Sequence, residues 1–342
     1  MNSVFSDCAT LLYLLFESVD NCGNPMLLNK KRRLESIVDA NQLNPELLSR
    51  LFSDADKIRS TEMRRPKKNR KLLEGKVMAT LFYEPSTRTR FSFESAMIKL
   101  GGSVISSENA GEFSSAAKGE KLEDTIRVVS SYADCIVIRH REDGAAATAA
   151  RVSTVPVING GDGKSQHPTQ AMLDMYTIKT ELGRLDNFRI AMVGDLAYGR
   201  TVKSLAMLLA QRKGIELLLV APESLRMDSG TVSTLRSGSV KVVENAGFEK
   251  ALAESDIIYM TRLQKERMRE DEYVASKSLY IIDEKRLSLV DASARVMHPL
   301  PHVEEIDLPI DVEKNDKRVA YFRQAENGLY VRMALLKELL RK

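Results

Sequence analysis

Residues 76–102 read KVMATLFYEPSTRTRFSFESAMIKLGG, and the rest of the chain can be interpreted from this stretch. The run Val77–Tyr83 is continuously apolar and β-prone, which is typical of a strand covered on both faces in a parallel sheet. Apolar side chains then recur on one face of a helix, at Phe93, Ala96, Met97 and Leu100. Gly101-Gly102 supplies the left-handed residue with which many helices end, so the stretch predicts a strand, a short turn and a helix.

A polar cluster, Ser86-Thr87-Arg88-Thr89-Arg90, falls at the first turn of the predicted helix. Unpaired backbone N–H groups and the positive end of the helix dipole meet there with three hydroxyls and two guanidiniums. All of these groups donate hydrogen bonds and none is a carboxylate, so the cluster predicts an anion site, most simply a phosphate site. A capped helix with surface arginines is the alternative, and it explains a single Ser or Thr better than five consecutive donors.

The segment Phe82–Arg90, FYEPSTRTR, closely resembles the carbamoyl-phosphate signature of the transcarbamoylase family. The resemblance to the catalytic chains of aspartate transcarbamoylases continues from about Leu34 to the C-terminus. It implies an α/β fold with two doubly wound parallel-sheet domains, a carbamoyl-phosphate domain and an aspartate domain, joined by interdomain helices. By this resemblance, residues 34–168 with 326–342 form the first domain and 169–325 form the second. Residues 1–33 have no counterpart in the family, and we expect either a poorly ordered extension or an upstream mis-start before Met26.

The length and composition agree with two globular domains. At 342 residues the chain is too long for one ordinary core. Hydrophobic residues at 43% and charged residues at 29% exclude wholesale disorder, and no run approaches the roughly 18 apolar residues of a membrane span. The three cysteines, Cys8, Cys22 and Cys135, have no metal-like spacing and suit a reducing compartment.

The composition of the N-terminal segment indicates the cellular location that we expect for the protein. Its apolar run Leu11–Phe16 has no Lys or Arg before it, and Asp7, Glu17 and Asp20 surround it. A secretory signal begins with basic residues, and an organellar transit peptide is rich in Arg and poor in acids. Neither pattern fits, so we expect a cytoplasmic protein without a membrane partner.

Two basic clusters stand out against a net charge of only +4. Residues 30–33 read KKRR, and residues 64–71 read RRPKKNRK. Such clusters can form a nucleic-acid surface, but here no aromatic residues are interleaved and no binding module is recognisable. Solvated helix ends and loops explain them better, and we expect no nucleic-acid partner.

Two further buried strands are expected at Cys135–Ile138 and Val155–Asn159. Arg139 follows the first, and the loop after the second leads to His167-Pro168-Thr169-Gln170 at the start of a helix. Ligands of open α/β sheets gather at the carboxyl ends of strands, so these residues should lie near Ser86–Thr89. A lone His or Arg is usually structural or on the surface, but the HPTQ motif of the transcarbamoylases matches all four residues at 167–170.

The predicted second domain contains a strand at Arg189–Val193 followed by GDLAYGRT at 194–201. This loop lacks the G-x-G-x-x-G dinucleotide pattern and differs from a P-loop by Arg200 in place of lysine. An NTPase is disfavoured because no second strand ending in Asp is placed for magnesium, whereas the family motif GDLxxGRT explains the same residues. Further strands are expected at 217–220, 257–260, 279–282 and 295–297, and two of these lead into TRLQ at 261–264 and HPLP at 298–301.

The resemblance implies a role for each matched position. The phosphate is held by Ser86, Thr87, Arg88, Thr89 and Arg139. The carbamoyl amide is bound by Gln170, and its carbonyl oxygen is polarised by Thr89, Arg139 and His167. The aspartate carboxylates are clamped by Arg200 and Arg262 with help from Gln264, and the amine faces the carbonyls of Pro299 and Leu300. From the loop Glu108–Gly119, Ser114 reaches the carbamoyl phosphate and Lys118 reaches both substrates, in the active site of the neighbouring subunit of a homotrimer.

These roles describe transfer of the carbamoyl group of carbamoyl phosphate to the amine of L-aspartate. The products are N-carbamoyl-L-aspartate and phosphate, in de novo pyrimidine biosynthesis. No cofactor or metal is required, because phosphate is a competent leaving group once its charge is neutralised. Ornithine is an alternative acceptor, but an ornithine enzyme would be expected to carry H-C-L-P where this chain has HPLP. A catalytically silent scaffold is another alternative, although every matched catalytic position retains its residue.

Three positions depart from the bacterial allosteric members of the family. Ala197 replaces the lysine of GDLKYGR, His302 replaces the arginine of HPLPR, and Arg269 stands where an acidic residue is expected. These positions lie among those that link domain closure to regulation. Control by a separate regulatory chain is therefore in doubt.

Overall fold

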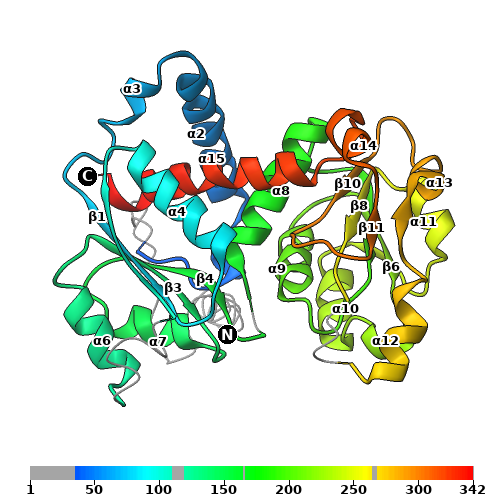
Figure 1. The fold of residues 1–342 in the computed structure, drawn as a ribbon, viewed down its shortest axis with the longest axis horizontal. Coiled ribbons are helices and arrows are strands. Elements are labelled where there is room, and N and C mark those ends of the chain that lie inside the picture. Colours follow the sequence, from blue (N-terminus) through cyan, green and yellow to red (C-terminus); the bar gives the residue numbers. More distant parts are fainter. Residues whose placement is uncertain (1–34, 110–118, 165, 264–267, 342) are drawn as a thin grey trace, which may run out of the picture. The chain divides into compact units, whose positions relative to one another are not determined.

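The computed structural model describes residues 35–109, 119–164, 166–263 and 268–341. The extension predicted for residues 1–33 lies outside them. The described chain contains two larger parallel sheets, one of four strands and one of five, each with helices packed against it (Figure 1). The predicted α/β class with two parallel-sheet domains is therefore confirmed.

The first sheet has the strand order β2-β1-β3-β4, and its neighbouring strands are all parallel. Its strands are β1 (Val77–Phe82), β2 (Ser103–Glu108), β3 (Cys135–His140) and β4 (Val157–Asp162). The helices between them are α4 (Thr87–Lys99), α6 (Leu122–Val129) and α7 (Ala145–Val152). The central strands β1 and β3 are buried along almost their whole length, which is why both are continuous apolar runs in the sequence.

The segment before β1 is helical. It comprises η1 (Ala40–Gln42), α2 (Pro45–Arg64) and α3 (Pro66–Asn69). Asn44 caps α2, because its side-chain oxygen accepts a hydrogen bond from the Leu47 amide at 2.9 Å, and Pro45 begins the helix. The helix α2 packs against α15 (Tyr321–Leu340), the last helix of the chain.

The second sheet has the strand order β10-β8-β5-β6-β7. Its strands are β5 (Phe188–Val193), β6 (Ile215–Val220), β7 (Lys241–Val243), β8 (Ile257–Met260) and β10 (Arg295–Met297). The helical segments of this part are α9 (Arg200–Leu209), η3 (Glu223–Leu225), α10 (Ser229–Ser237), α11 (Phe248–Glu254), α12 (Glu270–Lys277), α13 (Glu284–Leu287) and α14 (Ile310–Asn315). The strand expected at 279–282 is shorter, because only Ile282 belongs to a strand, β9 (Ile282–Asp283). That strand pairs with β11 (Ile306–Asp307) in a separate small sheet.

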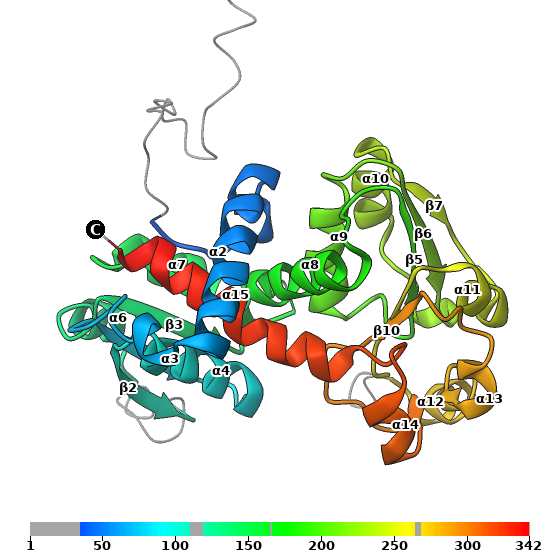
Figure 2. The same cartoon turned by 90° about the horizontal axis from the view of Figure 1, so that it is seen from above.

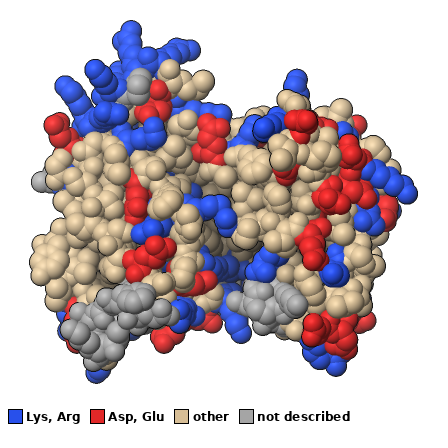
Figure 3. Space-filling model, in the orientation of Figure 1, with Lys and Arg blue, Asp and Glu red and all other residues tan. Residues whose placement is uncertain are grey.

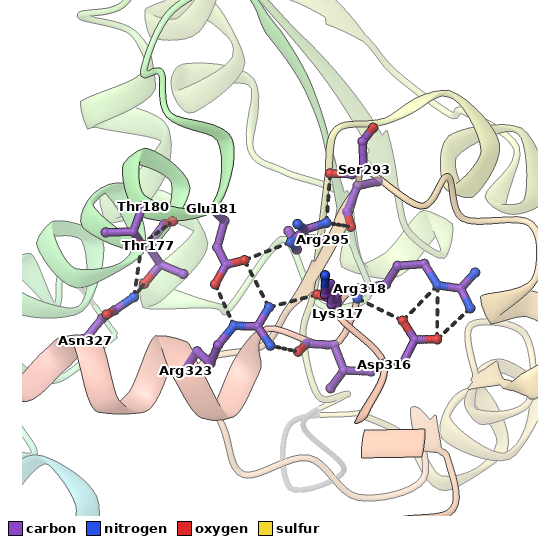
Figure 4. A network of polar contacts seen from close by, with 12 residues as sticks. Thr177, Thr180, Glu181, Ser293, Arg295, Asp316, Lys317, Arg318, Arg323 and Asn327 are labelled. Carbon is purple, nitrogen blue, oxygen red and sulfur yellow. Dashed lines mark hydrogen bonds and ion pairs between the residues drawn. The ribbon is translucent and has the colours of Figure 1, made fainter. Parts of the chain in front are cut away.

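Two helices connect the sheets, α8 (Pro168–Leu182) and α15, and they pack against each other (Figures 1 and 2). Glu181 of α8 accepts hydrogen bonds from Arg323 of α15 at 2.7 and 3.0 Å and from Arg295 of β10 at 2.8 Å (Figure 4). Further along α15, the side-chain amide of Asn327 donates a hydrogen bond to the Thr177 hydroxyl at 3.1 Å. The chain therefore passes between the sheets twice, along paired helices. No helix in the described ranges combines the length and the apolar character that a membrane span requires.

The end of α4 yields a test of the unit predicted from residues 76–102. Gly101 has a φ of +93°, and a Cβ at this position would lie 1.6 Å from the carbonyl oxygen of Arg70. We expect Gly101→Ala to lower the free energy of unfolding by at least about 3 kcal/mol, because it adds a main-chain clash to the usual strain of a left-handed residue. Urea denaturation measures this loss.

Gly75→Ala is the matched control. Gly75 also has a positive φ, +78°, but no atom lies within 4 Å of the point that a Cβ would occupy there, so only about 1–2 kcal/mol of backbone strain is expected. Equal losses in the two variants would contradict the close contact between Gly101 and Arg70.

Candidate active site

A cavity of about 330 Å³ lies between the first and second sheets and is lined from both sides. The part of the chain before β5 contributes Glu84, Ser86, Arg88, Thr89, Ser92, Arg139, Gly163, His167, Gln170 and Leu173. The part after β5 contributes Asp195, Tyr198, Gly199, Arg200, Thr201, Thr261, Arg262, His298, Pro299, Leu300, Pro301, Gln324, Ala325 and Arg332. Lys and Arg side chains gather in the hollow between the two halves (Figure 3). The motifs found in the sequence thus meet at one cavity whose volume suits a small ligand.

Three helices begin at this cavity: α4 after Ser86, α8 after His167 and α9 after Gly199. None of these three preceding residues makes a side-chain hydrogen bond that caps its helix. The Ser86 hydroxyl is therefore not used for capping, which argues against the capped-helix alternative. The positive ends of three helix dipoles favour an anion in the cavity. Thr87, by contrast, is exposed and does not line the cavity.

Glu84 joins two of the predicted arginines. Arg139, at the end of β3, is buried and donates to Glu84 Oε1 at 2.9 Å and to the Gly160 carbonyl at 3.2 Å. Arg200, at the start of α9, donates to the Gly163 carbonyl at 2.8 Å and to Glu84 Oε2 at 3.4 Å. Burial lowers the pKa of Arg139 to about 10, and the nearby Arg200 adds to this effect. Glu84 thus compensates charge in a cavity built for anions.

His167 is buried where α8 begins. Its backbone amide donates to the Ser204 hydroxyl of α9 at 2.9 Å, which ties the HPTQ motif to the second half of the chain. Burial, and then the positive charges of Arg200, Arg139 and Arg332, hold the pKa of His167 well below 6.5. The imidazole is therefore neutral at physiological pH and carries one N–H that can donate a hydrogen bond.

Gln170 and Arg332 form another wall of the cavity. Gln170, on the first turn of α8, donates from Nε2 to Asp174 Oδ1 at 2.8 Å. Arg332, on α15, donates to the Ser92 hydroxyl at 2.9 Å, and its guanidinium lies 5.0 Å from the centre of the Phe93 ring. Burial lowers the pKa of Arg332 to about 10.

Sequence reasoning missed Glu84, Asp174 and Arg332. Glu84 lies inside the family signature, directly after the predicted strand Val77–Tyr83. The signal for the other two was a charged residue within an apolar helical run: Asp174 lies in AMLDMYTI and Arg332 in LYVRMALL. Charged residues are rarely buried unless they are paired, so a charge on a buried helix face indicates a polar partner.

The HPLP segment contributes His298, Pro299, Leu300 and Pro301 to the cavity. His298 is buried, its Nδ1 accepts a hydrogen bond from the Leu300 amide at 2.8 Å, and its Nε2 lies 2.9 Å from Glu305 Oε1. These contacts hold a turn in which Leu300 has a φ of +55°, a conformation that non-glycine residues adopt rarely and often at functional sites.

The remaining predicted residues divide into two groups. Arg200 and Arg262 line the same cavity as Ser86, Arg88, Thr89 and Arg139. Ser114, Lys118 and Gln264 lie outside the described residues. Among the residues that are described, no group of three or more His, Cys, Asp or Glu side chains could hold a metal ion.

Two family models match the chain. Residues 35–180 match the carbamoyl-P binding domain of aspartate/ornithine carbamoyltransferase, and residues 186–339 match the Asp/Orn binding domain. The chain belongs to the aspartate/ornithine carbamoyltransferase family. A relative in this family, the chloroplastic aspartate carbamoyltransferase of Arabidopsis thaliana, is 50% identical over 313 residues, which cover 91% of this chain and 79% of the relative.

Solved structures of the carbamoyltransferase family align with the described fold. The catalytic subunit of M. jannaschii aspartate transcarbamoylase has a TM-score of 0.82 and 44% identity, covering 90% of this chain and 98% of that one. The Trypanosoma cruzi aspartate transcarbamoylase in complex with N-(phosphonacetyl)-L-aspartic acid has a TM-score of 0.83 and 39% identity, covering 90% and 96%. The resemblance to aspartate transcarbamoylase catalytic chains is thus confirmed.

The expected cytoplasmic location is wrong. The Arabidopsis carbamoyltransferase is named chloroplastic, and so are relatives from Oryza sativa and Pisum sativum. The expectation rested on the composition of the N-terminal segment and on the three cysteines. A low cysteine count indicates a reducing compartment without choosing among such compartments, and targeting signals are read separately from the folded domains.

The environment of His167 predicts its titration. We expect the ring to stay neutral between pH 8 and about pH 6, because burial and three nearby arginines disfavour the imidazolium. Since its folded-state pKa lies below the unfolded value, this residue should also make the protein lose stability as the pH falls below 6.5. Histidine ring NMR, assigned with His167→Gln, measures the titration, and that variant should lose less stability in acid. A protonation midpoint at or above the ordinary value would contradict the assignment.

Proposed function

We propose that this chain is an aspartate carbamoyltransferase whose two sheets each supply half of one active site. The chain binds carbamoyl phosphate and L-aspartate and transfers the carbamoyl group to the aspartate amine, giving N-carbamoyl-L-aspartate and phosphate in pyrimidine biosynthesis. The observation that carries this proposal is one cavity in which the STRTR and HPTQ motifs face Arg200, Arg262 and the HPLP turn. The family models and the aspartate carbamoyltransferases that share up to half of its residues support it.

The phosphate end of the substrate lies at the start of α4. Ser86, Thr87, Arg88, Thr89 and Arg139 neutralise the dianion, and the helix dipole adds to their effect. When the substrate phosphate arrives, Arg139 exchanges some of its interaction with Glu84 for the ligand. Support comes from the position of four of these five residues in the cavity lining, the exception being Thr87.

The carbamoyl carbon is activated by hydrogen bonds to its oxygen. Thr89, Arg139 and the neutral His167 donate to this oxygen, which gains negative charge as the amine attacks. Donors placed in advance for such charge typically contribute about 3 kcal/mol each. The C–N bond forms, the C–O bond to phosphate breaks, and the departing phosphate takes the proton that the amine gives up. Gln170 holds the carbamoyl amide during this change.

The second half of the chain orients aspartate. Arg200 and Arg262 bind its two carboxylates with help from Gln264, and the carbonyls of Pro299 and Leu300 face the amine. Fixing both substrates in line supplies much of the remaining acceleration. The chain divides accordingly into residues 34–168 with 326–342 for carbamoyl phosphate and 169–325 for aspartate. The family models support a division in this part of the chain, since one matches residues 35–180 and the other 186–339, but they assign residues 169–180 to the carbamoyl-phosphate side and 326–339 to the aspartate side.

The assembly is a homotrimer in which Ser114 and Lys118 enter the neighbouring active site. Several large apolar side chains of the first half are exposed and would be covered by a second copy: Phe91, Ile98, Ile105, Val128 and Tyr132. No regulatory chain is part of this proposal, given Ala197, His302 and Arg269. The chloroplastic plant relatives support a plastid location for the chain.

An assay with carbamoyl phosphate and a panel of amines tests the activity. We expect aspartate to be carbamoylated far faster than ornithine or putrescine. Arg262→Ala should lower kcat/KM for aspartate by roughly thirty- to a hundredfold, because it removes charge-assisted hydrogen bonds to a carboxylate. Arg236→Ala, an exposed arginine on α10 that pairs with Glu244, is the control and should keep the wild-type value. Faster transfer to ornithine would refute the aspartate site, and a folded chain inactive with every amine would favour the scaffold.

Reassembly of two inactive variants tests the shared site. Arg88→Ala and Lys118→Ala proteins are unfolded, mixed equally and refolded together. If each subunit passes its loop to one neighbour only and the trimers assemble at random, about three quarters of the trimers contain both variants. Each of these mixed trimers has one site, out of three, in which both residues are native. About one quarter of all sites should therefore recover activity. Refolding each variant alone is the control. If trimers with exchanged subunits stay inactive, Lys118 acts within its own chain and the shared-site model fails.

A further inference from the structure

The buried carboxylate of Asp174 contacts Gln170, the residue proposed to bind the carbamoyl amide. Asp174 is completely buried on α8, one turn after Gln170, and does not line the cavity. Its Oδ1 accepts hydrogen bonds from Gln170 Nε2 at 2.8 Å and from Gln324 Nε2 at 2.6 Å, and its Oδ2 accepts one from the Tyr259 hydroxyl at 2.8 Å. Neutral donors from α8, α15 and β8 thus converge on one acid.

This arrangement fixes the side-chain amide of Gln170. An ionised carboxylate only accepts hydrogen bonds, so the amide nitrogen of Gln170 must face Asp174. The amide oxygen is then left for the cavity, which Gln170 lines. A glutamine without such a partner could turn either its donor or its acceptor toward a ligand. Here the hydrogen bond to Asp174 favours the orientation that turns the acceptor toward the cavity.

The partners of Asp174 are themselves held in place. The Gln324 oxygen accepts a hydrogen bond from the His298 amide at 2.8 Å, so this side chain spans from α15 to the HPLP segment. The positive charge of Arg332, also on α15, favours the ionised form of Asp174. Burial raises the pKa of Asp174 to about 7, and the hydrogen bonds from Gln324, Tyr259 and Gln170 oppose that rise. The carboxylate is therefore ionised in mildly alkaline solution.

We propose that Asp174 is a positioning residue that makes the active site select a carbamoyl group over an acetyl group. The inference rests on the proposed role of Gln170. Carbamoyl phosphate and acetyl phosphate share the phosphate and the carbonyl and differ in an NH₂ group against a methyl group. A fixed acceptor binds the NH₂ group but is left without a partner against the methyl group, and sites of this kind reject the analogue that lacks the donor.

The test compares kcat/KM for the two acyl phosphates with aspartate as acceptor, at pH 8.5. Asp174→Leu keeps the branching of the side chain but removes the acceptor, and we expect the preference for carbamoyl phosphate to fall about tenfold. Asp174→Asn keeps an acceptor oxygen at this position and should stay within about threefold of the wild-type preference. A variant with a purely structural defect would lower both activities equally and leave the ratio unchanged.

Thr177→Val is the matched structural control. Thr177 lies on the same helix about two turns after Gln170, is as buried as Asp174, and accepts a hydrogen bond from the side-chain amide of Asn327 on α15. Loss of the Thr177 hydroxyl should therefore leave the ratio of kcat/KM for carbamoyl phosphate to kcat/KM for acetyl phosphate unchanged. In a Gln170→Met background, Asp174→Leu should have no further effect on the ratio, because the residue through which Asp174 acts is gone.

The outcomes separate this inference from the proposed function. A wild-type chain inactive with carbamoyl phosphate and aspartate overturns both. An active wild type whose preference is unchanged by Asp174→Leu, or is changed equally by Thr177→Val, overturns the positioning role alone. If Asp174→Leu does not fold, Asp174→Ala takes its place, since it also removes the acceptor and leaves the cavity lining unchanged. A loss of preference of about tenfold then supports the role, and an unchanged ratio refutes it.

Discussion

Several arginines lie close together around one cavity, and their mutual repulsion must be compensated by the surrounding residues. Arg139 and Arg332 are buried, Arg200 is largely buried, and all three lower the pKa of His167. Such a cluster is costly without negative charge, and Glu84 supplies some of it by joining Arg139 to Arg200. An anionic substrate can take over the same role, so the mutual repulsion of these arginines favours the binding of a phosphate and of carboxylates.

The fold explains how this charge is assembled. In a parallel sheet all carboxyl ends of the strands lie at one edge, and each is followed by a helix whose N-terminus points back toward that edge. Two such sheets, joined by α8 and α15, bring three helix N-termini to the same cavity. The ion pairs of Glu181 with Arg295 and Arg323 then tie the two connecting helices to β10. The site thus depends on the pairing of these helices as much as on the motifs.

A second layer of polar groups orients the groups that line the cavity. Asp174 fixes the amide of Gln170, and the Gln324 side chain links that acid to the HPLP turn. This layer lies apart from the arginines that supply the positive charge of the cavity. This separation allows strong electrostatic binding to coexist with discrimination between ligands of the same charge, because orientation acts through single hydrogen bonds at fixed positions.

The strand–turn–helix unit at 76–102, the family and the motifs that line the cavity can all be predicted from the sequence, because they depend on residues close together in the chain. Buried parallel strands can be recognised in the sequence as apolar runs, and the motifs follow at the ends of these runs. The partners of Glu84 and Asp174 can be identified only in the folded chain. Glu84 meets Arg200 across 116 residues, and Asp174 meets Gln324 across 150. Contacts between residues so far apart in the sequence cannot be predicted from local periodicity. They arise from the packing of helices and strands whose separation along the chain is arbitrary.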